Sequence, residues 1–107
     1  MNDTRLKWIE TRIHFFNVTC QKKIGHELSH LLEQFDNISV YKSECLGLIN
    51  ELSIGYFETK NPKIKLVLGM TKNVFSDMGS RLRVLQSIIS AEKEVYKDSM
   101  REPNNKE

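Results

Sequence analysis

Apolar side chains recur along the chain at the three- and four-residue intervals of one helix face. The first series runs through Leu6, Ile9, Ile13, Phe16 and Cys20, then Ile24, Leu28, Leu31, Phe35 and Ile38. The pattern resumes at Cys45, Ile49, Leu52 and Tyr56. This spacing predicts amphipathic α-helices, because half-buried strands would instead show alternating apolar positions. We therefore predict an all-α fold whose long helices pack in the manner of a coiled coil.

The clearest helix boundary in the sequence is Asn61-Pro62. An Asn side chain can cap a helix, and Pro suits the first helical position, where its missing N–H has no partner to lose. A second break is suggested near Asn37, because the Asp, Asn and Ser side chains of 36–39 compete for backbone hydrogen bonds. With both breaks the chain forms a three-helix bundle, and with the first alone it forms a helical hairpin. The nearly continuous apolar series favours the hairpin.

Two features complicate the first helix. The steps from Cys20 to Ile24 and from Ile24 to Leu28 are both four residues, which shifts the apolar stripe as an insertion does in a coiled coil. Residues 12–20 are also rich in good strand formers, so a strand there is an alternative. We expect residues 1–100 to form a single helical domain and 101–107 to be a disordered tail.

Composition and charge narrow the class of protein. The 107 residues carry a net charge of +2 from 16 basic and 14 acidic residues, interspersed along the chain, which argues against a nucleic-acid surface. Apolar runs stay well below the roughly 20 residues needed to cross a bilayer, so no membrane span is expected. Residues 1–10 do not resemble a secretory signal. We expect a cytoplasmic chain in which Cys20 and Cys45 are reduced and partly buried.

One motif could carry chemistry. His26-Glu27-Leu28-Ser29-His30 matches H-E-x-x-H, in which two histidines one helical turn apart can bind zinc and the Glu can act as a general base. At this point the chain resembles the zincin metallopeptidases. By resemblance to their thermolysin-like members, Glu51 in Ile49-Asn50-Glu51 would be the third zinc ligand. The resemblance thus implies a minimal zinc-dependent hydrolase that uses His26, Glu27, His30 and Glu51.

Other observations favour a protein without catalytic activity or cofactor. Only residues 1–23 precede the helix that would carry the motif, whereas zincins have a sheet upstream of it. On a helical wheel, His26 and His30 point roughly 150° away from the centre of the apolar arc, which places them on the solvated face. We therefore expect an interaction subunit or adaptor that binds a protein partner, or itself, through apolar helix stripes. The residues expected at this interface are Leu6, Ile9, Ile13, Phe16, Leu82, Leu85 and Ile89.

Overall fold

The described residues form a bundle of three α-helices. The computed structural model describes residues 1–21 and 27–101, in which α1 spans Asp3–Cys20, α2 Leu28–Thr59 and α3 Pro62–Arg101. The predicted all-α fold is confirmed, with three helices packed against each other and no strand among the described residues. The strand alternative for 12–20 is wrong, because those residues lie within α1.

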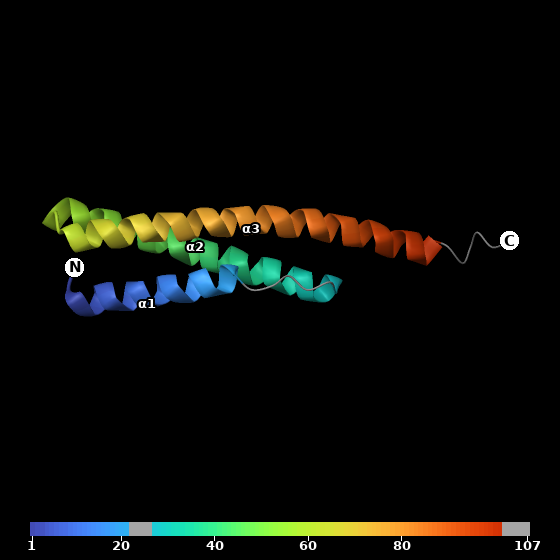
Figure 1. Cartoon of the computed structure of the whole chain (residues 1–107), viewed down its shortest axis with the longest axis horizontal. Coiled ribbons are helices and arrows are strands. Elements are labelled where there is room, and N and C mark those ends of the chain that lie inside the picture. Colours follow the sequence, from blue (N-terminus) through green and yellow to red (C-terminus); the bar gives the residue numbers. More distant parts are fainter. Residues whose placement is uncertain (22–26, 102–107) are drawn as a thin grey trace.

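The helices lie side by side in an elongated body of 73 × 18 × 14 Å (Figure 1). Helices α2 and α3 form an antiparallel hairpin, and α1 runs beside it from the end that carries the hairpin turn. The chain begins next to that turn: a Cβ built on Gly55 would lie 3.1 Å from the Cε of Met1. The side chain at position 55 therefore has to be small for the start of the chain to pack there.

The helix ends follow from local side-chain chemistry. The Oδ1 of Asn2 accepts a hydrogen bond of 2.8 Å from the backbone N–H of Arg5, which caps α1. Asn61 caps α3 in the same way through the N–H of Lys63, with Pro62 at the first position as predicted. Lys60 ends α2 in the left-handed conformation with φ 56°, and its N–H donates to the carbonyl of Tyr56.

The first break lies earlier than the sequence suggested. Helix α2 runs without interruption through Asn37, so the break suggested there is wrong. The favoured hairpin of two helices is also wrong, because the part of the chain before Pro62 forms both α1 and α2. Asp36 and Asn37 are exposed and reduce helix propensity only slightly, while Ile38 is buried in the core. The first break is instead at the end of α1, at Cys20, where the apolar stripe shifts its frame. Residues 102–107 of the expected tail lie outside the described residues, and Arg101 still belongs to α3.

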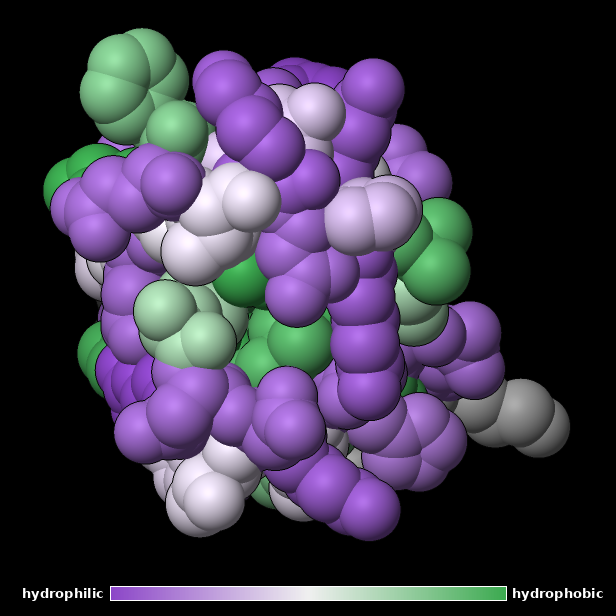
Figure 2. All heavy atoms as spheres, turned by 90° about the vertical axis from the view of Figure 1, so that its left-hand side faces the viewer, coloured by the Kyte–Doolittle hydropathy of each residue, from purple (hydrophilic) through white to green (hydrophobic). Residues whose placement is uncertain are grey.

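A continuous apolar core runs along the axis where the helices meet. It contains Leu6, Ile9, Ile13, Phe16 and Cys20 of α1, Leu31, Ile38, Cys45, Leu48 and Leu52 of α2, and Ile64, Val67, Val74, Met78, Leu85 and Ile89 of α3. The one buried polar side chain among the described residues is Thr71, whose hydroxyl donates to the carbonyl of Val67. Figure 2 views the bundle from the end with the turn and shows apolar atoms enclosed by hydrophilic side chains.

Polar contacts fix α1 on the hairpin. The guanidinium of Arg12 donates two hydrogen bonds of 2.8 and 2.7 Å to the carboxylate of Glu44 on α2. The Nε of Arg81 on α3 donates to the carbonyl of Cys20 at 3.0 Å. That carbonyl lies in the last turn of α1, where backbone acceptors lack partners within the helix and a positive charge is favourable. Helix α1 is thereby held to both helices of the hairpin.

Candidate interaction surface

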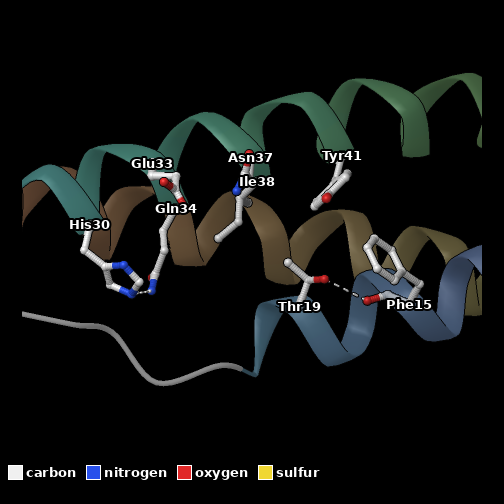
Figure 3. Close-up of a pocket in the computed structure, with 8 residues that line it drawn as sticks. All are labelled: Phe15, Thr19, His30, Glu33, Gln34, Asn37, Ile38 and Tyr41. Carbon is white, nitrogen blue, oxygen red and sulfur yellow. Dashed lines mark hydrogen bonds between the residues drawn. The ribbon is translucent and has the colours of Figure 1, made fainter.

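A pocket between α1 and α2 includes His30, the second histidine of the H-E-x-x-H motif (Figure 3). It is lined by Phe15, Thr19, His30, Glu33, Gln34, Asn37, Ile38 and Tyr41. His30 is exposed, as the helical wheel predicted, and its Nε2 lies 3.0 Å from the Nε2 of Gln34. Glu27 is also exposed and directly precedes α2, while His26 lies outside the described residues.

The proposed third zinc ligand cannot reach this pocket. Glu51 and His30 lie twenty-one positions apart on the uninterrupted helix α2, which separates them by about 31 Å along its axis. The carboxylate of Glu51 instead accepts hydrogen bonds from Nε and Nη2 of Arg5. The zinc site of His26, His30 and Glu51 is therefore wrong. In residues 1–21 and 27–101, no group of three His, Cys, Asp or Glu side chains could hold a metal ion.

The residues expected at an interface lie mostly inside the chain. Six of them are buried in the core described above: Leu6, Ile9, Ile13, Phe16, Leu85 and Ile89. Leu82 is half-buried at the edge of that core. Helix α1 folds back along the hairpin, so its apolar stripe is used within the bundle.

Many large apolar side chains nevertheless remain exposed on this extended helical body. They include Trp8, Phe15 and Val18 on α1, Val40, Leu46, Ile54 and Phe57 on α2, and Leu66, Met70, Val95, Tyr96 and Met100 on α3. Single exposed apolar residues are ordinary, whereas apolar residues that gather over a groove indicate a contact surface. None of the three helices offers a stretch apolar and long enough to cross a bilayer.

One such groove runs between α2 and α3. Its lining residues are Ser39, Lys42, Ser43 and Leu46 of α2 and Phe75 and Leu82 of α3. The grooves that α1 helps to form are lined by residues on other sides of α2 and α3. Tyr41 of α2 lines one of them, and Val74 of α3 lines another. The groove at Leu46 therefore lies on the side of the hairpin that α1 does not cover.

Rows of residues spaced by seven extend this groove along both helices. On α2 the row is Leu28, Phe35, Lys42, Ile49 and Tyr56, and on α3 it is Leu68, Phe75, Leu82, Ile89 and Tyr96. Seven residues are nearly two helical turns, so each row stays on one side of its helix. We define the open face by Phe35, Lys42, Leu46 and Ile49 of α2 and Leu68, Phe75 and Leu82 of α3. Most of these side chains are half-buried, and Leu46 is 47% exposed.

The row on α3 continues beyond the hairpin. Helix α3 has 40 residues and α2 has 32, and Figure 1 shows that α3 runs past the start of α2. On this overhang Tyr96 is 60% exposed and Met100, one turn further on, is 64% exposed. The apolar surface of the open face thus extends onto the last part of α3, which runs past the start of α2.

The open face carries positive charge. The Nζ of Lys42 lies 4.7 Å from the ring centroid of Phe75, a cation–π contact in the middle of the groove. The Nζ of Lys65 lies 5.9 Å from the ring of Tyr56, and Lys72 and Lys93 continue the row of Lys65 at intervals of seven. Four rows of residues spaced by seven form and flank this face. On α2 they run from Leu28 to Tyr56 and from Leu32 to Ser53, and on α3 from Leu68 to Tyr96 and from Lys65 to Met100. They contain no Asp or Glu, and the nearest acidic residue in a neighbouring row of α2 is Asp36, in the row of Ser43 at the edge of the groove.

The sequence contained a signal for this surface that was not used. Leu68, Phe75, Leu82, Ile89 and Tyr96 repeat at intervals of seven on a helix whose core positions, apart from Ile89, form a separate series. Two apolar rows on one helix predict contacts with more than one neighbour. Leu82 and Ile89 of this row were expected to contact a partner. Leu82 lies on the open face, whereas Ile89 is buried in the core.

Comparisons with protein-family models, with curated proteins and with solved structures find no match to this chain. The fold and the distribution of charged and apolar side chains are therefore the basis for a function.

Proposed function

We propose that this chain is a non-enzymatic subunit or adaptor that binds a protein partner through the open face of the α2–α3 hairpin. The observation that carries the proposal is the apolar groove around Leu46, Phe75 and Leu82, which α1 leaves uncovered. Burying such a groove is favourable by about 25 cal/mol per Å² of apolar surface removed from water. A helix that lies in a groove between two helices completes a four-helix arrangement.

The residues expected from the sequence take two roles in this proposal. Leu82 would contact the partner directly. The other six, including Phe16 and Leu85, would hold α1 and α3 in place, so that the opposite side of the hairpin stays rigid. The free, buried thiols of Cys20 and Cys45 agree with the proposed cytoplasmic location, where cysteines remain reduced.

Site-specific photo-crosslinking tests the proposal. A photoreactive amino acid at position 46 should give a discrete crosslinked product in the native host. The matched control is position 40, because Val40 is also exposed and apolar on α2 but lies outside the open face. The proposal is wrong if position 46 gives no discrete product, or if both positions give the same one.

A further inference from the structure

The charges around the open face indicate what kind of partner it fits. We infer that the partner segment is an amphipathic α-helix with acidic flanks, which lies along the groove with a carboxylate facing Lys42. This inference rests on the proposed function and adds the chemistry of the ligand. Its argument is charge complementarity, since the four rows 28–56, 32–53, 68–96 and 65–100 carry Lys42, Lys65, Lys72 and Lys93 but no acidic residue.

Lys42 is the central residue in this inference. Its ammonium lies over the ring of Phe75, and a Cβ built on Gly79 would lie 3.5 Å from its Cε. Lys42 therefore reaches across the groove from α2 to α3. A docked helix would remove water from this charge, which is costly unless a carboxylate takes the place of the water. An acidic residue at the centre of the partner helix meets that need.

A second copy of the chain fits the face less well. Back-to-back packing of two open faces would bring two sets of Lys42, Lys65 and Lys72 together without a carboxylate between them. Like charges placed opposite each other in an interface are unfavourable. Two half-buried carboxylates of α2, Glu44 and Glu51, are paired with Arg12 and Arg5 of α1 and so are not directed to the open face.

An anionic membrane surface also fits the face less well. Helices that bind in the membrane interface project their apolar side chains outward into the lipid. On the open face, Phe75, Leu82 and Ile49 are half-buried between the helices. This recessed shape matches the ridge of side chains on a docking helix.

Binding of three synthetic peptides to the whole chain tests the inference. The peptides share one amphipathic Leu-rich helical pattern and differ only in flanks of Glu, Gln or Lys, and fluorescence anisotropy measures their affinity. The Glu-flanked peptide should bind about tenfold more tightly than the Gln-flanked one, and the Lys-flanked peptide most weakly. In the double variant Lys42→Glu and Lys72→Glu this order should reverse.

Charge-matched variants serve as controls. The double variant Lys7→Glu and Lys63→Glu makes the same change of charge at exposed positions outside the open face, and it should keep the original order. If circular dichroism shows that Lys42→Glu disturbs the fold, Lys42→Gln with Lys72→Gln should abolish the preference for Glu flanks. A preference that persists in these neutral variants would overturn the inference.

The remaining outcomes separate this inference from the proposed function. Equal binding of the Glu- and Gln-flanked peptides, lost in Leu46→Asp, would refute the acidic partner and leave the interaction surface in place. Binding of no peptide would refute both. Cosedimentation with vesicles of equal parts phosphatidylcholine and phosphatidylserine, lost in Lys42→Gln with Lys72→Gln, would replace the helix by a membrane surface. A doubled mass in light scattering, returned to the monomer mass by Leu46→Asp, would identify a second copy as the occupant.

Discussion

The guanidinium of Arg5 and the carboxylate of Glu51 face each other with two hydrogen bonds, which join the first turn of α1 to the C-terminal half of α2. These hydrogen bonds stabilise the charged carboxylate and lower the pKa of Glu51 below its ordinary value, although desolvation opposes this shift. The same contact raises the pKa of Arg5. The ion pair thus links the position of α1 to the protonation state of one acidic side chain.

Glu51→Gln should make the stability of the protein less dependent on acidic pH. Because the folded state lowers the pKa of Glu51, the ion pair stabilises the fold above the unfolded pKa of about 4.3 and loses this effect as pH falls through the folded pKa. The side chains of Arg5 and Glu51 are 41% and 34% exposed, so we expect a contribution of only about 0.5 kcal/mol. Urea unfolding at about pH 6 and about pH 3 measures it. The control is Glu58→Gln, an exposed carboxylate on the same helix, and an equal effect of both variants would contradict the prediction.

Phe16→Ala should destabilise the protein far more than Phe15→Ala. Phe16 is fully buried between α1 and the hairpin, whereas its neighbour Phe15 is 41% exposed. Removing a buried Phe side chain costs about 3–5 kcal/mol from lost burial and the cavity that remains. Both rings contact Tyr41, with centroid distances of 5.7 Å for Phe16 and 5.2 Å for Phe15, so the comparison isolates burial from ring contact.

Thermal unfolding followed by circular dichroism measures this difference. The prediction fails if the two variants have the same midpoint, because α1 would then not be held by its buried stripe. A loss of helix content in Phe16→Ala before heating would indicate that α1 has left the hairpin.

The sequence predicted the class of fold but not the path of the chain. The three-four spacing of apolar residues identified the core positions of α1 and, except for Leu48, those of α2. The Asn61-Pro62 boundary followed from capping chemistry alone. The break near Asn37 was wrong because a polar residue on the solvated side of a helix does not interrupt it when its neighbour Ile38 packs in the core. Local propensities are weak, and tertiary packing decided between them.

The candidate site was harder to predict because it depends on which apolar stripe of each helix is buried within the bundle and which stripe stays exposed. Leu6 and Ile9 were expected to face a partner, but α1 folds onto the hairpin and buries them. The sequence alone does not show that a third helix covers one side of α2 and α3 and leaves Leu46 and Phe75 on the other. The assignment of Glu51 as a zinc ligand also depended on the tertiary structure. It required Glu51 to lie close to His30, which is impossible because both residues belong to the continuous helix α2.

The left-handed residue at the hairpin turn offers a test of backbone conformation. Lys60 adopts φ 56°, a conformation in which a Cβ is unfavourable and Gly is not. Lys60→Gly should therefore be about 1 kcal/mol more stable than Lys60→Ala. Both variants lose the contacts of the Lys60 ammonium with Tyr56 and Phe57, so the comparison reports the backbone alone. Chemical unfolding of the two variants measures the difference, and equal stabilities would mean that this turn is not strained in solution.

Cys45 and Cys20 should resist alkylation in the folded protein. Burial raises the pKa of Cys45 to about 11 and also raises that of Cys20, because a thiolate is poorly solvated in the core. The Sγ of Cys45 is fully buried and donates to the carbonyl of Thr71 at 3.5 Å. At about pH 8 only about one Cys45 side chain in a thousand would be thiolate, against about one in four for a free thiol. Iodoacetamide labelling followed by mass spectrometry should therefore modify both cysteines rapidly in guanidinium chloride and very slowly without it. Fast labelling of Cys45 in buffer would mean that α2 and α3 separate often enough to expose the core.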